Sequence, residues 1–253
     1  MTASCAPRAI RILLAEDDAT NQLVAQGMLS LAGYTDVTTV PDGAQAVLAA
    51  GSGDFDIVLM DCQMPRLDGY EATQRLRAEG HTFPIVALTA NATQAERERC
   101  MACGMNDFLS KPIDEVRLAE AIARWTGGAP APATTPDQAT TPQPAQAFSR
   151  EAALDQLSGD EELLAAVLAS FREHGPGLLR SAHADLAAGD AVELRRHLHS
   201  LAGSAGTLGA TALRTLAREM ETLAENGRVG EVRTRLPEIE GVMSRFLEEA
   251  RNW

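Results

Sequence analysis

Five short apolar segments, each followed by a segment of helical periodicity, constrain the N-terminal half of this 253-residue chain more than any other feature. Short apolar runs bounded by turn residues are typical of buried strands in a parallel sheet. Alternation of strand and helix predicts right-handed crossovers, with helices on both faces of the sheet. The predicted strands are residues 10–15, 37–40, 57–61, 84–89 and 107–110, and helices are predicted over 20–32, from 43 onward, and over 69–78, 92–103 and 116–125.

The C-terminal part of the chain has helical periodicity from Phe148 onward, without a predicted strand. Short breaks at Gly189-Asp190 and Asn226-Gly227 favour antiparallel neighbouring helices. We therefore expect an all-α bundle to follow the α/β part.

Residues 127–147 differ from both parts, because they consist of Ala, Pro, Thr, Gln and Gly with a single charge at Asp137. A segment without large apolar residues cannot offset the entropy lost on ordering, and repeated prolines keep it extended. The expected organisation is a tail over 1–9, an α/β domain over 10–126, a flexible linker over 127–147 and a helical domain over 148–253.

Composition restricts the partners and the location of the chain. A formal charge of −13 argues against nucleic acid and anionic membranes, because both bind basic surfaces. We recognise neither a signal peptide nor an apolar segment that could span a bilayer, so we expect a cytoplasmic protein without membrane insertion. Cys100 and Cys103 have the C-x-x-C spacing, but a structural zinc site needs four ligands, so free thiols are expected.

Acidic residues follow the first and third predicted strands. Glu16 and Asp17 come directly after residues 10–15, and Asp61 ends the strand 57–61. Chemistry in open α/β sheets lies just beyond the carboxyl ends of the strands, where these carboxylates are expected to meet. Clustered carboxylates repel one another unless a cation lies among them, and Mg²⁺ prefers oxygen ligands. An aspartate beside Mg²⁺ can attack a phosphorus centre and form an acyl phosphate.

Two further side chains are expected at the same edge of the sheet. Thr89 ends the fourth strand, and Lys111, the only lysine of the chain, follows the fifth. A hydroxyl and a compact ammonium group suit contact with a phosphoryl group. Each residue alone also has an ordinary explanation, since acids favour helix N-termini, aspartate forms turns and lysine commonly lies on surfaces. The combination, in this order along the strands, is far more specific.

Residues 10–126 resemble a response-regulator receiver domain, which implies a flavodoxin-like (βα)5 fold with Asp61 as the phosphorylation site. By this resemblance Glu16 and Asp17 form the acid pair, and Asp17, Asp61 and the backbone carbonyl of Gln63 hold Mg²⁺. The Glu-Asp pair followed by Asn21-Gln22 is similar to receivers of hybrid histidine kinases. The matching motifs are Leu14-Ala15-Glu16-Asp17-Asp18, Met60-Asp61-Cys62-Gln63-Met64-Pro65, Asp68-Gly69, Leu88-Thr89-Ala90 and Ser110-Lys111-Pro112.

The same resemblance implies a conformational switch. Thr89 and Lys111 are expected to contact the phosphoryl group, and the Lys111-Pro112 peptide bond is expected to be cis. A phosphate would draw the Thr89 hydroxyl inward and leave space for Phe108, at the switch-aromatic position, to turn inward. Without the resemblance, a simple core aromatic is the alternative interpretation of Phe108.

A second candidate site lies in the helical part, at His199. Leu194, Leu198, Leu201, Ala205 and Leu208 form an apolar stripe that is expected to face the core. His199 lies off that stripe and over small residues at i+3, i+4 and i+7, which predicts an exposed imidazole that a partner can reach. A surface histidine in a tightly packed Gly/Ala helix fits the spacing equally well.

Residues 148–250 resemble a histidine phosphotransfer (HPt) domain, through the run from His199 to Ala205 followed by Leu208-Gly209. By this match His199 is the phosphorylated residue. The family usually has a lysine where this chain has Ala202, and that cation steadies the phosphoryl group. Arg195 and Arg196, one turn earlier, are candidate substitutes.

Together the two resemblances imply a two-component phosphorelay protein. A sensor histidine kinase would phosphorylate Asp61, and His199 would pass phosphoryl groups between receiver domains or to a downstream response regulator. We see no Gly-rich ATP site, so the chain is not a kinase by itself; it is either free-standing, which Met1 favours, or the C-terminal end of a hybrid kinase.

Two other readings stay open at this stage. In one, phosphorylation of Asp61 switches an interaction surface, and the helical domain only docks partners or drains phosphate. In the other, a flavodoxin-like domain and a structural bundle have no relay function.

Overall fold

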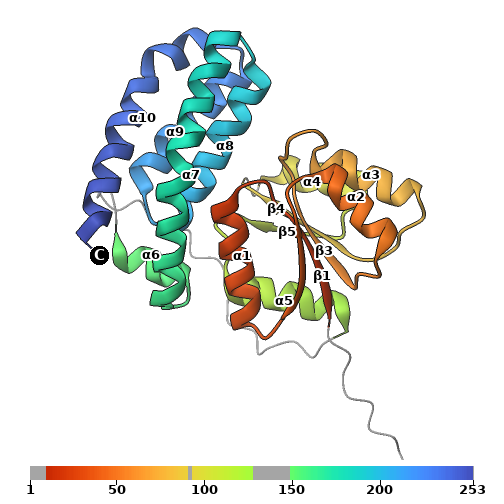
Figure 1. The fold of residues 1–253 in the computed structure, drawn as a ribbon. Coiled ribbons are helices and arrows are strands. Elements are labelled where there is room, and N and C mark those ends of the chain that lie inside the picture. Colours follow the sequence, from red (N-terminus) through yellow and green to blue (C-terminus); the bar gives the residue numbers. More distant parts are fainter. Residues whose placement is uncertain (1–9, 91–92, 128–148, 253) are drawn as a thin grey trace, which may run out of the picture. The chain divides into compact units, whose positions relative to one another are not determined.

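The computed structural model describes residues 10–90, 93–127 and 149–252, and these form two compact units. One unit is built around a parallel sheet and the other around long helices (Figure 1). The expected tail over 1–9 and nearly all of the expected linker over 127–147 lie outside the described residues.

The sheet has five strands, which are all parallel, as the alternation of strands and helices predicts, and their order is β2-β1-β3-β4-β5. Strands β3 and β4 lie inside the sheet and are buried along their whole length, because helices cover both faces of the sheet (Figure 1). The strands are β1 (Arg11–Ala15), β2 (Asp36–Val40), β3 (Ile57–Asp61), β4 (Ile85–Thr89) and β5 (Asp107–Ser110).

Five helices flank this sheet, with α1 and α5 on one face and α2, α3 and α4 on the other (Figure 1). Apolar side chains of the strands, such as Leu13, Val58 and Met60, pack with Leu76 and Cys100 to form a core beneath α2–α4. The helices are α1 (Ala19–Leu31), α2 (Gly43–Ser52), α3 (Gly69–Ala78), α4 (Gln94–Cys103) and α5 (Glu115–Thr126).

Local signals in the sequence set the ends of these helices. Asp18 begins α1, since its Oδ1 accepts the backbone N–H of Asn21 at 2.9 Å. Asp68 caps α3 in the same way, and Gly104 ends α4 with a φ of 104°, a left-handed conformation that glycine adopts at little cost. Gly69 is needed for a different reason, because a Cβ there would lie 2.1 Å from the carbonyl oxygen of Asp61.

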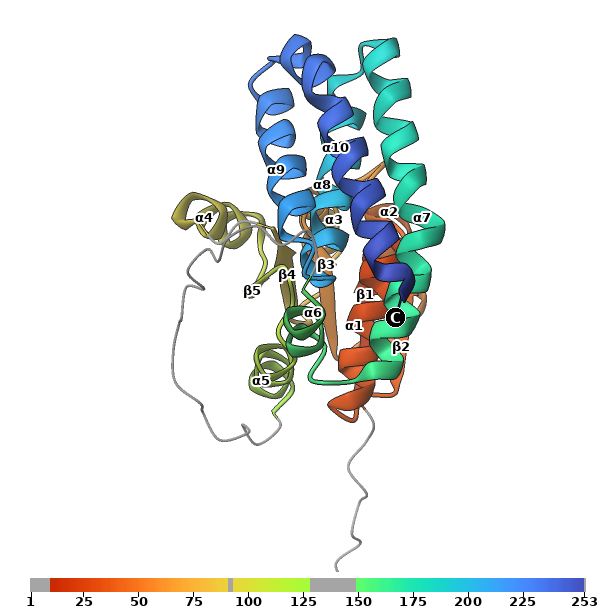
Figure 2. The same cartoon turned by 90° about the vertical axis from the view of Figure 1, so that its left-hand side faces the viewer.

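The second unit is a bundle of four long antiparallel helices with a short leading helix (Figure 2). The turn from α7 to α8 uses Gly189, with a φ of 75°, and then Asp190 as the next cap. Phe171 and Phe246 meet edge to face in the core, with ring centroids 5.5 Å apart. The elements are α6 (Arg150–Gln156), α7 (Glu161–Ala188), α8 (Ala191–Thr207), α9 (Thr211–Glu225), α10 (Val229–Glu249) and a 3-10 turn over Ala250–Asn252.

Within the ranges that the structure describes, no helix combines the length and the apolar character needed to cross a membrane.

Candidate functional site

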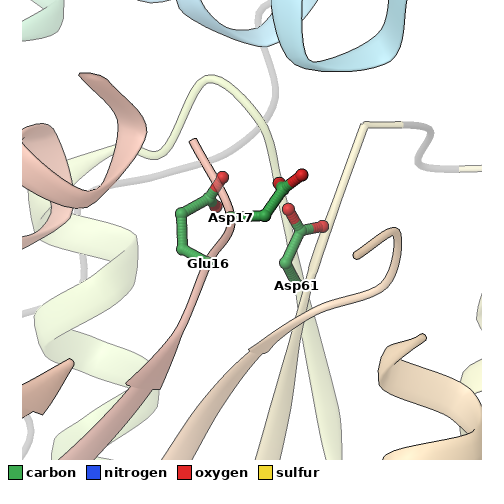
Figure 3. Close-up of side chains that lie close together, drawn as sticks. All are labelled: Glu16, Asp17 and Asp61. Atoms are coloured by element: carbon green, nitrogen blue, oxygen red, sulfur yellow. The ribbon is translucent and has the colours of Figure 1, made fainter. Parts of the chain in front are cut away.

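Three carboxylates meet at the carboxyl end of the sheet. Because β1 pairs with β3 with Ala15 opposite Met60, the residues that follow each strand become neighbours. Glu16, Asp17 and Asp61 each offer a carboxylate oxygen, and these oxygens all lie within 4.8 Å of one another (Figure 3). Glu16 and Asp61 are both 1% exposed, so solvent screens their mutual repulsion poorly.

The donor set of this cluster fits a small divalent cation. Three carboxylate oxygens are hard ligands, and a cation such as Mg²⁺ offsets the repulsion among them. The backbone N–H of Gln63 donates to Asp61 Oδ1 at 3.1 Å and so orients the Asp61 carboxylate. A role for the Gln63 carbonyl as a metal ligand stays a prediction.

The neighbouring strands bring the remaining predicted residues of this site to the same edge. Asp61 pairs in register with Leu88, and Thr89 pairs with Ser110, which directly precedes Lys111. Thr89 and Lys111 are both buried. The Lys111-Pro112 peptide bond is cis, as the resemblance predicts. Contacts of Thr89 and Lys111 with a phosphoryl group stay predictions.

Helix α4 covers two aromatic rings of this unit with arginine side chains. The Arg97 guanidinium carbon lies 5.4 Å from the ring centroid of Phe108, the predicted switch residue, which is partly buried. The Arg99 guanidinium carbon lies 3.8 Å from the ring centroid of Tyr70, whose hydroxyl donates to Glu96. These contacts attach α4 to β5 and α3.

A pair of neighbouring cysteines begins at Cys62, the residue that follows Asp61 in the chain. Cys62, Cys100 and Cys103 are buried free cysteines, and the sulfur atoms of Cys62 and Cys100 are 4.0 Å apart. The hydrogen bond with Cys100, together with burial, raises the pKa of Cys62 well above its usual value, so Cys62 remains a neutral thiol beside the carboxylates.

In the helical unit, the apolar stripe of α8 faces the core as predicted, and His199 lies beside it. The access of a partner to the imidazole, which the spacing predicts, stays a prediction. His199 Nδ1 lies 2.8 Å from Oε1 of Glu221 on the adjacent helix α9. Arg218, also on α9, lies 2.8 Å from the other oxygen of Glu221 and 3.4 Å from His199 Nδ1.

The charges of this trio fix the tautomer of the histidine. Burial raises the pKa of Glu221, but the hydrogen bond with His199 and the charge of Arg218 outweigh it and bring that pKa below its usual value. Glu221 is therefore an ionised carboxylate, which can only accept, so His199 Nδ1 must carry the proton. When the ring is neutral, its lone pair therefore lies on Nε2.

Sequence reasoning missed Glu221 and Arg218, although a signal for the first was present. Leu213 and Ala217 are buried residues of α9, and Glu221 continues their spacing at i+8 and i+4. A carboxylate on the apolar face of a helix requires a partner, because an unpaired buried charge is very costly. The sequence could therefore have marked Glu221 as a buried carboxylate that needs a partner, but it could not have identified His199 as that partner.

Three other predicted or neighbouring residues of α8 make different contacts. His197 donates from Nδ1 to Asp185 on α7 at 2.6 Å. Arg196 contacts Glu193 at 2.7 Å and the Nε2 of His197 at 2.8 Å. Arg195 forms a long ion pair, at 3.5 Å, with Glu225. A phosphate-supporting role for Arg195 or Arg196 stays a prediction.

Comparison with known families gives matches in both units. Residues 12–123 match the model of the response regulator receiver domain, and residues 166–253 match the model of the Hpt domain. The first matched range contains Glu16, Asp17 and Asp61, and the second contains His199 and Glu221.

Several curated proteins and solved structures are similar to this chain. The sensor histidine kinase GacS of Pseudomonas protegens is 31% identical in an alignment of 252 residues, which covers 96% of this chain and 27% of that kinase. The two-component response regulator ORR41 of Oryza sativa is 37% identical over 47% of this chain and 97% of its own length. The receiver domain of the sensor histidine kinase PA1611 from Pseudomonas aeruginosa, crystallised with a magnesium ion in its active-site cleft, is 48% identical over 47% of this chain and 99% of that domain, with a TM-score of 0.44.

The share of each relative's length that this chain covers differs between the kinases and the regulator. The chain spans about a quarter of the length of the two GacS kinases that it matches, and nearly all of the single-domain regulator.

Proposed function

Because this chain is a two-component phosphorelay protein, in which a response regulator receiver domain precedes an Hpt domain, we propose that it carries phosphoryl groups on both Asp61 and His199. In this proposal a sensor histidine kinase is the upstream donor for Asp61. A second receiver domain, or a downstream response regulator, exchanges phosphoryl groups with His199. In this proposal the phosphoryl transfers take place in the cytoplasm, where ATP phosphorylates the donor histidine of the sensor kinase.

Asp61 is the acceptor in the receiver domain. A carboxylate oxygen of Asp61 attacks the phosphorus of the donor phosphohistidine, so that an O–P bond forms and the N–P bond breaks. The electron pair returns to the donor imidazole, which leaves as a neutral ring with its proton on the other nitrogen. The hydrogen bond from the Gln63 amide orients the Asp61 carboxylate for this attack. When bound by Glu16, Asp17, Asp61 and the Gln63 carbonyl, Mg²⁺ offsets the negative charge that gathers on the transferred group.

Three further residues complete the receiver site in this proposal. The Thr89 hydroxyl and the Lys111 ammonium group donate to the oxygens of the phosphoryl group. Once Thr89 has moved towards the phosphate, Phe108 turns inward, and its contact with Arg97 is lost. That rearrangement would change the surface of α4 and β5, which partners can read.

His199 is the acceptor in the Hpt domain. Its Nε2 attacks the phosphorus of an aspartyl phosphate, so that an N–P bond forms, an O–P bond breaks and the donor carboxylate leaves. The ring then carries a positive charge, with the proton on Nδ1 still donated to Glu221. Glu221 therefore has two effects. It keeps the proton on Nδ1, so that the nucleophilic lone pair is on Nε2, and it stabilises the positive charge that develops on the ring.

The hydrogen bond between His199 and Glu221 is the observation that carries the proposal. A helical domain that only docks partners needs neither a fixed tautomer nor a buried carboxylate behind the histidine. A domain that accepts and returns a phosphoryl group at Nε2 benefits from both.

Chemical stability of the bound phosphate tests the proposal. We would label the chain with radioactive phosphate from a purified sensor kinase, or from acetyl phosphate with Mg²⁺, and compare it with Asp61→Asn and His199→Gln. Base-labile label should disappear in Asp61→Asn, and label that is acid-labile but stable to base should disappear in His199→Gln.

Two outcomes would contradict this account. Label at Asp61 with none ever at His199 would favour a phosphorylation-switched docking module. Failure of both residues to take up label would leave only a flavodoxin-like domain joined to a structural bundle.

A further inference from the structure

Phosphorylation of His199 creates an electrostatic problem in the Hpt domain. The phosphoryl group brings up to two negative charges, and the ring that bears it already contacts the ionised, buried carboxylate of Glu221. Like charges at this separation disfavour each other strongly where solvent is excluded. The residue one turn after His199 on α8 is Ala202, which offers no charge. A cation must therefore come from elsewhere in the domain or from a partner.

Arg218 lies where its guanidinium group can supply a cation to both Glu221 and His199. Its Nη1 atom lies 2.8 Å from Glu221 Oε2, while the other oxygen of the same carboxylate accepts from His199. The same Nη1 atom is 3.4 Å from His199 Nδ1. Arg218 and Glu221 are three residues apart on α9, so one helix face holds both groups against α8.

A second arginine supports this arrangement from the preceding turn of α9. Arg214 passes over Gly206 of α8, where a Cβ would lie 3.1 Å from the Cδ atom of Arg214. Burial lowers the pKa of Arg214, and the charge of Arg218 lowers it further, as expected for two guanidinium groups held close together. Both arginines line a groove along α9 together with Thr211, Thr215, Thr222 and the carboxylate of Glu219.

The arginines of α8 are placed differently. Arg195 pairs with Glu225, and Arg196 contacts Glu193 and His197.

We infer that Arg218 is the positioning residue of the Hpt site, which neutralises Glu221 in the unmodified domain and offsets the charge of the phosphoryl group after transfer to His199. This inference rests on the proposed phosphorylation of His199. Arg218 acts through Glu221 and the imidazole, and it supplies from α9 the cation that position 202 of α8 lacks.

The test measures direct phosphorylation of His199 in the full chain. Asp61→Asn serves as the background, so that radioactive phosphoramidate, a small donor, labels His199 alone. In this background we expect Arg218→Ala to slow labelling on the order of 10-fold or more, a loss typical for groups that orient a reactive histidine. Arg218→Lys should keep much of the rate, since it retains the charge.

A pH profile separates this role from a merely structural one. The positive charge of Arg218 lowers the pKa of His199, so its removal should raise that pKa. Labelling requires the neutral ring, and its acid limb should therefore move to higher pH in Arg218→Ala. Adding Ala202→Lys to Arg218→Ala should restore labelling, because a cation returns beside the same ring.

Two arginine variants serve as controls. Arg228→Ala removes an exposed pair with Glu231 that has the same three-residue spacing on α10, and it should label at the parent rate. Arg196→Ala tests the alternative cation on α8. Thermal unfolding of each variant identifies any loss that comes from misfolding.

Each outcome decides one question. Equal rates and equal pH profiles in the parent and in Arg218→Ala would overturn the inference, as would a loss in Arg196→Ala that Arg218→Ala does not share. If the Asp61→Asn background takes up no label, or keeps it after His199→Gln is added, the proposed phosphorylation of His199 itself is wrong.

Discussion

The pair formed by His199 and Glu221 allows a quantitative prediction for the substitution Glu221→Gln. The hydrogen bond from Nδ1, 2.8 Å long, ends on a buried and ionised carboxylate. Net hydrogen bonds to charged groups contribute about 1.5–3 kcal/mol, and neutral ones about 0.5–1.5 kcal/mol. Glutamine can still accept from Nδ1, so the substitution removes on the order of 1 kcal/mol of the preference for the reactive tautomer.

That difference corresponds to a rate of His199 phosphorylation reduced roughly 5-fold, since about 1.4 kcal/mol equals a factor of ten. Glu221→Ala removes the whole interaction and should reduce the rate more strongly, by roughly 10-fold to 100-fold. Labelling by phosphoramidate in the Asp61→Asn background measures the rate. The ¹⁵N chemical shifts of the His199 ring measure, independently, the fraction of the tautomer with the proton on Nδ1.

A matched control exists on the same helix. His197 donates from Nδ1 to Asp185 at 2.6 Å, and Asp185→Asn should leave the labelling of His199 unchanged. The reasoning is refuted if Glu221→Gln labels at the parent rate with an unchanged ¹⁵N spectrum, or if Asp185→Asn lowers the rate equally.

Three further predictions concern the receiver domain. Asp17→Asn removes a ligand from the carboxylate cluster, and it should raise the Mg²⁺ concentration needed for half-maximal labelling of Asp61 by acetyl phosphate roughly 10-fold. Arg97→Ala removes the cation over the Phe108 ring, a contact worth about 0.5–1 kcal/mol, and NMR of that ring should show a roughly 2-fold to 5-fold larger population of its inward conformer. Gly69→Ala places a Cβ 2.1 Å from the Asp61 carbonyl oxygen and should cost about 1–3 kcal/mol of unfolding free energy in urea.

Each of these predictions has a control or an opposing result. A Mg²⁺ dependence unchanged by Asp17→Asn would exclude Asp17 from the cation site. An unchanged Phe108 spectrum in Arg97→Ala would show that the arginine does not hold the ring. Gly51→Ala is the control for Gly69→Ala, because a Cβ on Gly51 of α2 meets no atom within 4 Å and should not destabilise the chain.

The receiver part of the fold follows closely from local patterns in the sequence. Strand β3 and helix α3 have the predicted ends at Asp61, Gly69 and Ala78, because a buried apolar run and an aspartate cap leave little freedom there. The proximity of Glu16 and Asp61 follows from the order of the strands in a parallel sheet. Local chemistry and topology therefore suffice for this half of the candidate site.

The surroundings of His199 could not be predicted in the same way. Helical periodicity places a residue relative to its own helix, so it correctly separates His199 from the apolar stripe of α8. It does not say which residues of α9 lie against the ring, since that depends on the rotation and offset of two packed helices. For this reason the contacts of Glu221 and Arg218 with the imidazole became visible only in the structure.

The central claim is that one chain carries two distinct phosphorylated residues, and ³¹P NMR of the full chain tests it most directly. After incubation with phosphoramidate and Mg²⁺, we predict one acyl phosphate resonance that Asp61→Asn removes and one phosphohistidine resonance that His199→Gln removes. A single protein-bound resonance that survives His199→Gln would contradict the claim.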